Sequence, residues 1–154
     1  MLDLADRDSE ILADQPIFAI DVSPARTWAT IVAVGANATN KTHVEITSRK
    51  GTLDHRPGTT WVLPRMTQLA KTYPGAVVVM LAKSQAALFG QSLQDLGFAV
   101  NFIQSADYPA ACAGLVDLVA TGELAHLGDI DLSAAAEAAV LVPVGEEQVR
   151  FGRR

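Results

Sequence analysis

The apolar and polar positions change period along the chain, and the changes set the predicted elements. Residues 17–20 and 76–81 are unbroken apolar runs of strand length. Such runs are typical of central strands that are buried on both faces. Residues 42–49 instead alternate polar and apolar side chains, which is typical of a strand with one solvated face. The chain is organised around the first run.

The order of the elements predicts a mixed α/β sheet. Strands are expected over 16–22, 27–35, 42–49, 76–81, 98–103 and 148–151. Helical spacing predicts helices over 60–73, 85–96, 108–121 and 131–140. A turn is expected at 36–41 and a loop at 50–59. The predicted helix caps are Thr59 or Thr60, Ser84, and Asp131 or Ser133.

Composition indicates one folded domain. The chain has 154 residues, 49% hydrophobic and 19% charged, which suits a domain with its own core. The single Cys112 excludes a disulfide framework and a multi-cysteine zinc site, and its Ala-rich surroundings favour a buried role over a nucleophile. No apolar run reaches about 18 residues, so no membrane span is expected. The N-terminus has no signal-peptide pattern, which favours a cytoplasmic protein.

The charge is concentrated at the N-terminus. Residues 1–14 hold five acids and one base, and they carry −4 of the net charge of −5. We interpret residues 1–15 as an acidic linker, tail or peripheral helix before a nearly neutral domain over 16–154. A nearly neutral domain neither indicates nor excludes a nucleic-acid binder with a local basic patch.

One stretch imitates a nucleotide-binding loop. Residues 35–42 nearly spell G-x-x-x-x-G-K-[ST], but Asn40 stands where the second glycine is needed. The residues that follow have a strand pattern, whereas that loop must open a helix. A hairpin turn is therefore expected, and no nucleotide.

Asp21 is the first candidate for chemistry, because it follows the central apolar run directly. Burying an unpaired carboxylate costs several kcal/mol, so Asp21 must be solvated in a turn, hydrogen-bonded or bound to a cation. One interpretation is a turn begun by Asp21 and Ser23 and closed by Pro24. The other is a cation site at the open edge of the sheet.

Three antiparallel strands followed by helix–strand–helix–strand form the plan of an RNase H-like fold, with helices flanking a mixed sheet. Four segments, in the same order, resemble the C-terminal nuclease domain of phage terminase large subunits. They are Phe18-Ala-Ile-Asp-Val-Ser-Pro24, Arg56-Pro-Gly-Thr-Thr-Trp61, Tyr108-Pro-Ala-Ala-Cys-Ala-Gly-Leu-Val-Asp117 and Gly122-Glu-Leu-Ala-His126. The resemblance runs from about residue 16 to the end.

The resemblance implies a metal-dependent DNA endonuclease that cuts concatemeric viral DNA during packaging. An acidic cluster that includes Asp21 would hold two Mg²⁺ or Mn²⁺ ions about 4 Å apart, one activating water and one stabilising the leaving oxygen. Double-stranded DNA is the implied substrate, with the portal and the small terminase subunit as further partners. The implied location is the cytoplasm of an infected bacterial host.

The sequence departs from that pattern at two of three acids. The second acid is expected at the end of the 76–81 strand, where Met80 stands nearest and no acid is present. The third is expected in a final helix beyond Arg154. Cleavage is therefore expected to be weak or absent. The alternatives are a non-catalytic RNase H-like module that binds DNA or a packaging partner, and an unrelated α/β domain.

Other polar residues have ordinary structural interpretations beside a ligand role. Glu45 is expected on an exposed strand face close to Asp21, and Asp117 in a helix with a structural hydrogen bond or cap. The remaining candidates are expected at the surface or in turns and caps: His55, His126, Asp129 and Asp131.

Two basic groupings could contact DNA phosphates. The first precedes the first helix and comprises Arg49, Lys50, His55 and Arg56; the second comprises Arg150, Arg153 and Arg154. The alternative is a set of solvated surface charges. The acidic segment over 1–14 could mask such a patch or only favour solubility.

Overall fold

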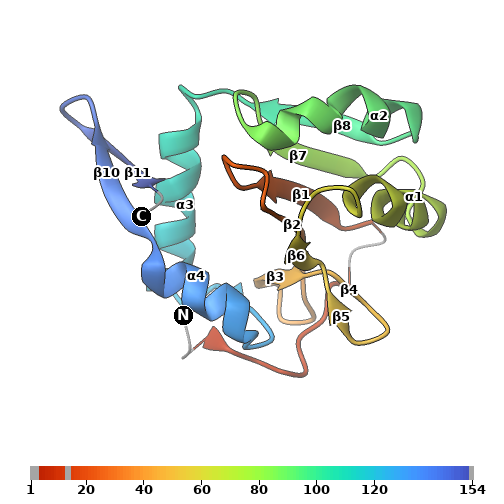
Figure 1. Ribbon diagram of the computed structural model, residues 1–154. Coiled ribbons are helices and arrows are strands. Elements are labelled where there is room, and N and C mark those ends of the chain that lie inside the picture. The colour runs from red at the N-terminus through yellow and green to blue at the C-terminus, as the bar shows by residue number, and fades with distance from the viewer. Residues whose placement is uncertain (1–3, 13–14, 153–154) are drawn as a thin grey trace.

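Strand β1 (Ile17–Val22) lies in the middle of a seven-stranded mixed sheet (Figure 1). The computed structural model describes residues 4–12 and 15–152. β1 pairs antiparallel with β2 (Trp28–Ala36) and parallel with β7 (Val77–Leu81). The strand order is β8-β7-β1-β2-β3-β9, and β6 pairs with β2 beside this path. The other strands are β3 (Thr42–Ile46), β4 (Ser48–Arg49), β5 (Thr52–Leu53), β6 (His55–Pro57), β8 (Ala99–Ile103), β9 (Leu124–Ala125), β10 (Val140–Val144) and β11 (Gln148–Gly152).

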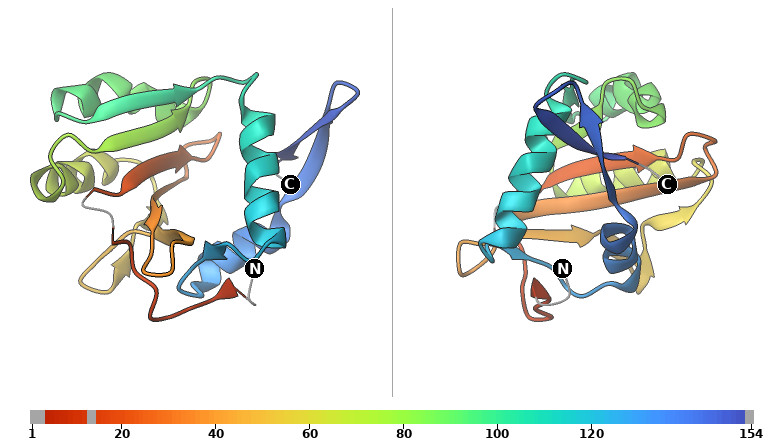
Figure 2. Two further views of the ribbon diagram at one scale, coloured as in Figure 1. Left: turned by 180° about the vertical axis from the view of Figure 1, so that it is seen from behind. Right: turned by 90° about the vertical axis from the view of Figure 1, so that its left-hand side faces the viewer.

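Helices lie on both sides of this sheet (Figures 1 and 2). They are α1 (Val62–Thr72), the 3-10 helix η2 (Gln85–Phe89), α2 (Gly90–Asp95), α3 (Tyr108–Ala120) and α4 (Ile130–Ala138). The right-hand view of Figure 2 places α3, α4 and the β10–β11 hairpin in front of the strands, with α1 behind them. The mixed sheet and its flanking helices confirm the predicted RNase H-like plan.

The two faces of β1 have different environments because successive side chains of a strand point to opposite faces. Phe18, Ile20 and Val22 are 1–4% exposed and pack with α1, η2 and α2 in the main core. We call this side the core face. Ala19 and Asp21 point to the opposite side, which we call the outer face.

The predicted loop over 50–59 is wrong, because it contains two short strands, β5 and β6, and follows directly after β4. β4 and β5 pair as a hairpin around Lys50 and Gly51, whose φ values of +51° and +80° fit a two-residue type I′ turn. β6 then pairs with β2 through His55 and Thr30. Pairing with neighbouring strands, and not local propensity, defines these short segments. β9 and β10 were also not predicted, and the expected 42–49 strand is divided at Thr47.

The predicted side-chain helix caps are not formed. Neither Thr59 nor Thr60 caps α1, which begins after Trp61. Ser84 is the N-cap residue of η2, but its hydroxyl donates to the Leu81 carbonyl. At α4 the N-cap is Asp129, so the expected caps at Asp131 and Ser133 are wrong.

The described part of the acidic N-terminal segment lies against the domain. The Asp6 N–H donates to the His126 carbonyl at 2.7 Å, and the Leu12 N–H donates to the Ala36 carbonyl at 2.9 Å. Ser9 is buried, and its Oγ lies 2.7 Å from Nδ1 of His43. These contacts fix the segment beside β9 and the end of β2.

Residues 37–41 form the expected hairpin turn between β2 and β3. The Asn37 side-chain oxygen accepts from the backbone N–H groups of Thr39 and Lys41. Asn40 has a φ of +59°, which asparagine tolerates in turns. Within 4–12 and 15–152, no helix is long and apolar enough for a membrane span.

The core contact of α2 gives a test of this packing. Leu93 is fully buried, whereas Leu88 in η2 is 71% exposed. Leu93→Ala should lower the free energy of unfolding by about 2–5 kcal/mol, because it removes buried apolar atoms and leaves a cavity. Leu88→Ala, the matched control, should change it by less than about 0.5 kcal/mol. Equal losses in urea unfolding would contradict the placement of α2.

Candidate functional site at Asp21 and a neighbouring basic pocket

Asp21 lies at the carboxyl end of β1, exposed on the outer face. It pairs with Thr30 of β2, which places it in the strand ladder and not in the following turn. Ser23 organises that turn, because its Oγ accepts from the N–H groups of Thr27 and Trp28. The carboxylate is therefore at the sheet edge, as the cation-site interpretation requires.

Directly paired residues share a face, so the ladder extends a row of side chains across the sheet. Thr30 pairs with His55 of β6, and the register of β1 with β7, continued from Ala19–Val79, brings Leu81 beside Asp21. Leu81 in turn pairs with Ile103 of β8. The outer-face row is thus His55, Thr30, Asp21, Leu81 and Ile103.

The position beside Asp21 is Leu81, which corrects the expectation for Met80. Met80 is 2% exposed and belongs to the core on the opposite face. Neither residue is an acid. The next charged side chain after β7 is Lys83, which carries the opposite sign.

The described residues do not fit a two-ion centre. Across 4–12 and 15–152, no three His, Cys, Asp or Glu side chains gather closely enough to hold a metal ion. Two divalent ions need several carboxylates, because one Asp cannot neutralise or ligate both. Asp21 alone does not provide that donor set.

The other acids that the sequence offered lie elsewhere. Glu45 pairs with Ala33, which points into the core, so Glu45 is on the opposite face from Asp21. The expectation that Glu45 lies close to Asp21 is therefore wrong. Glu45 contacts Nε2 of His43 at 3.0 Å. Asp117 is exposed on α3.

His126 is buried beside the N-terminal segment, and Asp129 is half-buried at the start of α4. His126 is fully buried, and its Nδ1 accepts from the Gly128 N–H at 3.0 Å. The expectation of a surface His126 is wrong. Burial raises the pKa of Asp129, and the charges of Glu45 and Asp131 add to the rise while His126 opposes it.

Four cationic side chains surround a second pocket beside α1, which we call the basic pocket. Arg49, Lys50, Arg56 and Arg65 line it with Trp61, Thr52 and Gln68, and its volume is about 400 Å³. The Arg56 guanidinium lies 4.0 Å from the centre of the Trp61 ring, a cation–π contact. Arg65 was not among the basic residues singled out from the sequence.

A buried carboxylate organises this pocket. Asp54 is 1% exposed and accepts from Nε of Arg65 at 2.7 Å, from Arg56 at 3.0 Å and from the Thr47 hydroxyl at 2.6 Å. The Asp54 charge is neutralised by its ion pairs with Arg56 and Arg65, so the rim of the pocket stays positive. Arg49 and Lys50 extend from the β4–β5 hairpin at that rim.

The basic residues predicted as one grouping lie in different places. His55 does not line the basic pocket; its ring stacks on Trp28 at 4.9 Å and its Nδ1 lies 2.7 Å from the Thr30 hydroxyl. Alternation along β6 explains this, because His55 and Arg56 point to opposite faces. Arg150 lies in β11, and Arg153 and Arg154 are outside the described residues.

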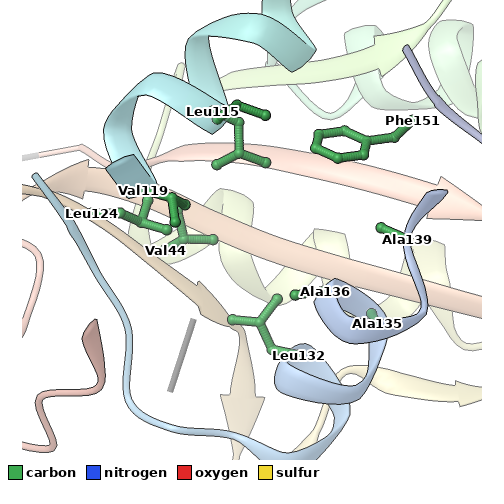
Figure 3. Close-up of a pocket in the computed structure, with 10 residues that line it drawn as sticks. Val44, Leu115, Val119, Leu124, Leu132, Ala135, Ala136, Ala139 and Phe151 are labelled. Atoms are coloured by element: carbon green, nitrogen blue, oxygen red, sulfur yellow. The ribbon is translucent and has the colours of Figure 1, made fainter. Parts of the chain in front are cut away.

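A third cavity has no polar chemistry. It measures about 400 Å³ and lies between α3, α4, β3 and β11 (Figure 3). Its lining is apolar throughout: Val44, Leu115, Val116, Val119, Leu124, Leu132, Ala135, Ala136, Ala139 and Phe151. No side chain there could act as acid, base, nucleophile or metal ligand.

Several solved structures that share this fold come from phage large terminases. The large terminase nuclease from thermophilic phage G20c with bound magnesium superposes with a TM-score of 0.60 at 13% identity, covering 97% of this chain and 75% of that one. The HK97 bacteriophage large terminase superposes with a TM-score of 0.71 at 12% identity, and the match covers 97% of this chain and 37% of that one. The Thermus phage P74-26 large terminase nuclease domain has a TM-score of 0.56 at 15% identity, and the match covers 97% of this chain and 82% of that one.

The chain therefore has the RNase H-like fold of large terminase nuclease domains, as its sequence predicted. Other structures of the G20c nuclease, also similar to this chain, contain cobalt and zinc. No protein-family model and no curated protein sequence matches the chain.

The buried carboxylate gives a second test. Asp54→Asn should lower the free energy of unfolding by roughly 3 kcal/mol, because it leaves the Arg65 charge without its buried partner. Asp95→Asn, at an exposed carboxylate of α2, should change it by less than about 0.5 kcal/mol. Urea unfolding measures both. A loss for Asp54→Asn no larger than that of the control would show that Asp54 does not organise the pocket.

Proposed function

We propose that this chain is the nuclease-type domain of a phage terminase large subunit and acts on double-stranded DNA during packaging. The observation that carries the proposal is the position of Asp21, at the carboxyl end of the central strand of an RNase H-like sheet. The likeness to the G20c and P74-26 nucleases supports it. The proposed substrate is concatemeric viral DNA in the cytoplasm of an infected bacterium, and the proposed partners are the portal and the small terminase subunit.

Asp21 is the proposed catalytic residue and metal ligand. A carboxylate oxygen is the donor that Mg²⁺ and Mn²⁺ prefer, and the G20c nuclease has been solved with magnesium. Leu81 beside Asp21 supplies no second ligand. One ion at most would be held by the described residues, and only weakly.

A second candidate function is a non-catalytic module that binds DNA. The aliphatic Leu81 beside Asp21 and the lack of an acidic cluster in the described part of the chain favour it. Both candidates share the fold and the DNA contact, and they differ in strand cleavage.

The basic pocket is the proposed contact for the DNA backbone. Arg49 and Lys50 are exposed on the β4–β5 hairpin, and Arg56 lies beside them against Trp61. Phosphate binding by such side chains releases counterions and is therefore weakened by salt. The grouping is small, so sequence-independent binding of modest affinity is expected. His55, on the other side of β6, stays a proposed contact only if DNA also reaches the outer face.

Cleavage by residues 1–154 should be weak or absent. Supercoiled plasmid would be incubated with the purified chain and Mn²⁺, and nicked product measured on a gel. Two-ion hydrolysis needs ligands that the described residues do not provide. Any residual nicking should disappear in Asp21→Ala and persist in Asp95→Ala. Robust nicking that Asp21→Ala abolishes would show that other ligands complete the centre.

Duplex binding should depend on the β4–β5 hairpin. Arg49→Ala with Lys50→Ala should weaken binding at low salt and reduce the slope of log affinity against log salt by about two, one per lost phosphate contact. Lys41→Ala, at an exposed lysine of the β2–β3 turn, is the matched control and should leave the slope unchanged. Fluorescence anisotropy over a salt series measures both. An unchanged slope in the double variant would exclude this surface as the DNA site.

A further inference from the structure

A cleft opens beside Asp21, at the carboxyl ends of β7 and β8. Its volume is about 380 Å³, and it lies where these strands meet the start of α3 and the β10–β11 hairpin. Leu81 and Ile103 line it, and both belong to the outer-face row that contains Asp21. The full lining is Leu81, Lys83, Ser84, Ile103, Ser105, Tyr108, Val144 and Arg150.

The lining of this cleft holds two cations and no acid. Lys83 follows β7, and Arg150 comes from β11, 67 positions later in the sequence. β11 is held on α3 partly through the Phe151 N–H, which contacts Sγ of Cys112 at 3.4 Å. The fold thus brings two distant cations to one cleft. None of the three ion pairs found between described residues involves Lys83 or Arg150.

We propose that this cleft binds a phosphate group between Lys83 and Arg150, directly beside Asp21. Two cationic side chains with different donor geometry suit a phosphate, since guanidinium groups bind oxyanions through paired N–H donors and lysine adds a point charge. The proposal goes beyond the basic pocket, which lies on the other side of β6. The proposal rests on the proposed function in one respect: the assignment of the bound phosphate group to DNA.

The hydroxyl groups of the cleft divide into two kinds. The Ser84 hydroxyl donates to the Leu81 carbonyl, and the half-buried Tyr108 hydroxyl is a weak acid. Burial raises the pKa of Tyr108, the Cys112 and Asp21 side chains add to the rise, and Arg150 opposes it, so the phenol stays protonated at neutral pH. The exposed Ser105 hydroxyl lies in the same cleft and can donate to a bound phosphate.

The charge of Asp21 defines the competing explanation. Its effect on Tyr108, together with that of Arg150, shows that both charges act on the same side chain at the cleft. Lys83 and Arg150 could therefore serve only to neutralise Asp21. The two explanations differ for the parent chain. It should bind phosphate if the cations form a phosphate site, whereas binding should appear only after the Asp21 charge is removed if the cations serve only to neutralise it.

The experiment is a titration of the full chain with inorganic phosphate, in which ¹⁵N-resolved NMR spectra are recorded at each phosphate concentration. Shifts are expected at the backbone N–H groups of Lys83, Ser84 and Ser105. Lys83→Ala and Arg150→Ala should each weaken binding about tenfold, the effect of losing one charge-assisted contact. Asp21→Asn should strengthen it. Lys41→Ala and Lys83→Arg, which leave the cleft cations in place, should change affinity less than threefold, about 0.7 kcal/mol by RT ln K.

The phosphate source is tested with a short single-stranded oligonucleotide, with and without a 5′-phosphate. Preferential binding of the phosphorylated form, lost in Lys83→Ala, assigns the cleft to a terminal phosphate; equal binding, also lost, assigns it to backbone phosphodiesters. Both results support the site. No shift at the cleft with inorganic phosphate, or equal affinity in Lys83→Ala and Arg150→Ala with unchanged folding, would overturn it. Because Arg49→Ala with Lys50→Ala leaves the cleft intact, loss of duplex binding in that variant has no bearing on this result.

Discussion

The register of β1 against its two neighbours is the constraint on which the rest of the structure depends. β1 is antiparallel to β2 and parallel to β7, so one strand connects the hairpin half of the sheet to the helix–strand half. A shift of one residue would exchange the faces of every side chain. Phe18 and Ile20 would leave the core, and Asp21 would enter it. Burial of the apolar positions therefore fixes Asp21 at the exposed outer edge.

That constraint also explains the chemistry beside Asp21. The partner position on β7 is Leu81 and its neighbour on β8 is Ile103, so the row has aliphatic side chains where a two-ion nuclease needs carboxylates. Positive charge gathers instead, at Lys83 and Arg150 in the cleft and at four side chains around the basic pocket. Among the described residues, Asp54 is the one fully buried carboxylate, and it accepts hydrogen bonds from Arg56 and Arg65 that hold both side chains in place. An arrangement of this kind favours phosphate binding over metal-ion catalysis.

The sequence was sufficient for the parts of the fold that local pattern determines. The apolar runs of β1 and β7 and the helical spacing of α1 and α3 predicted the mixed sheet and its helices. The short strands β5, β6 and β9 were not predictable, because they exist through pairing with β4, β2 and β3 and not through their own composition. The predicted cap position at Ser84 is correct, but its hydroxyl donates to the Leu81 carbonyl and does not cap η2. The predicted caps of α1 and α4 are wrong.

The candidate site was predictable only in part. Asp21 was singled out because a carboxylate after a buried run is unusual, and its position on β1 is as predicted, whereas its role as a metal ligand stays a prediction. Asp54 and Arg65 were missed, since nothing in one sequence shows that residues 11 positions apart form an ion pair. The separation of His55 from Arg56 follows from strand alternation and needed β6 to be recognised first. Lys83 and Arg150 line one cleft because β11 packs on α3, which a single sequence does not show.

The most direct test of this account is the number of Mn²⁺ ions that the chain binds, measured by isothermal titration calorimetry on residues 1–154 and on Asp21→Asn. Asp21 with aliphatic and cationic neighbours predicts at most one weak ion per chain, lost in Asp21→Asn. Two ions bound tightly by the parent chain, and both lost in the variant, would show that a second set of ligands completes a two-ion centre and would contradict the account.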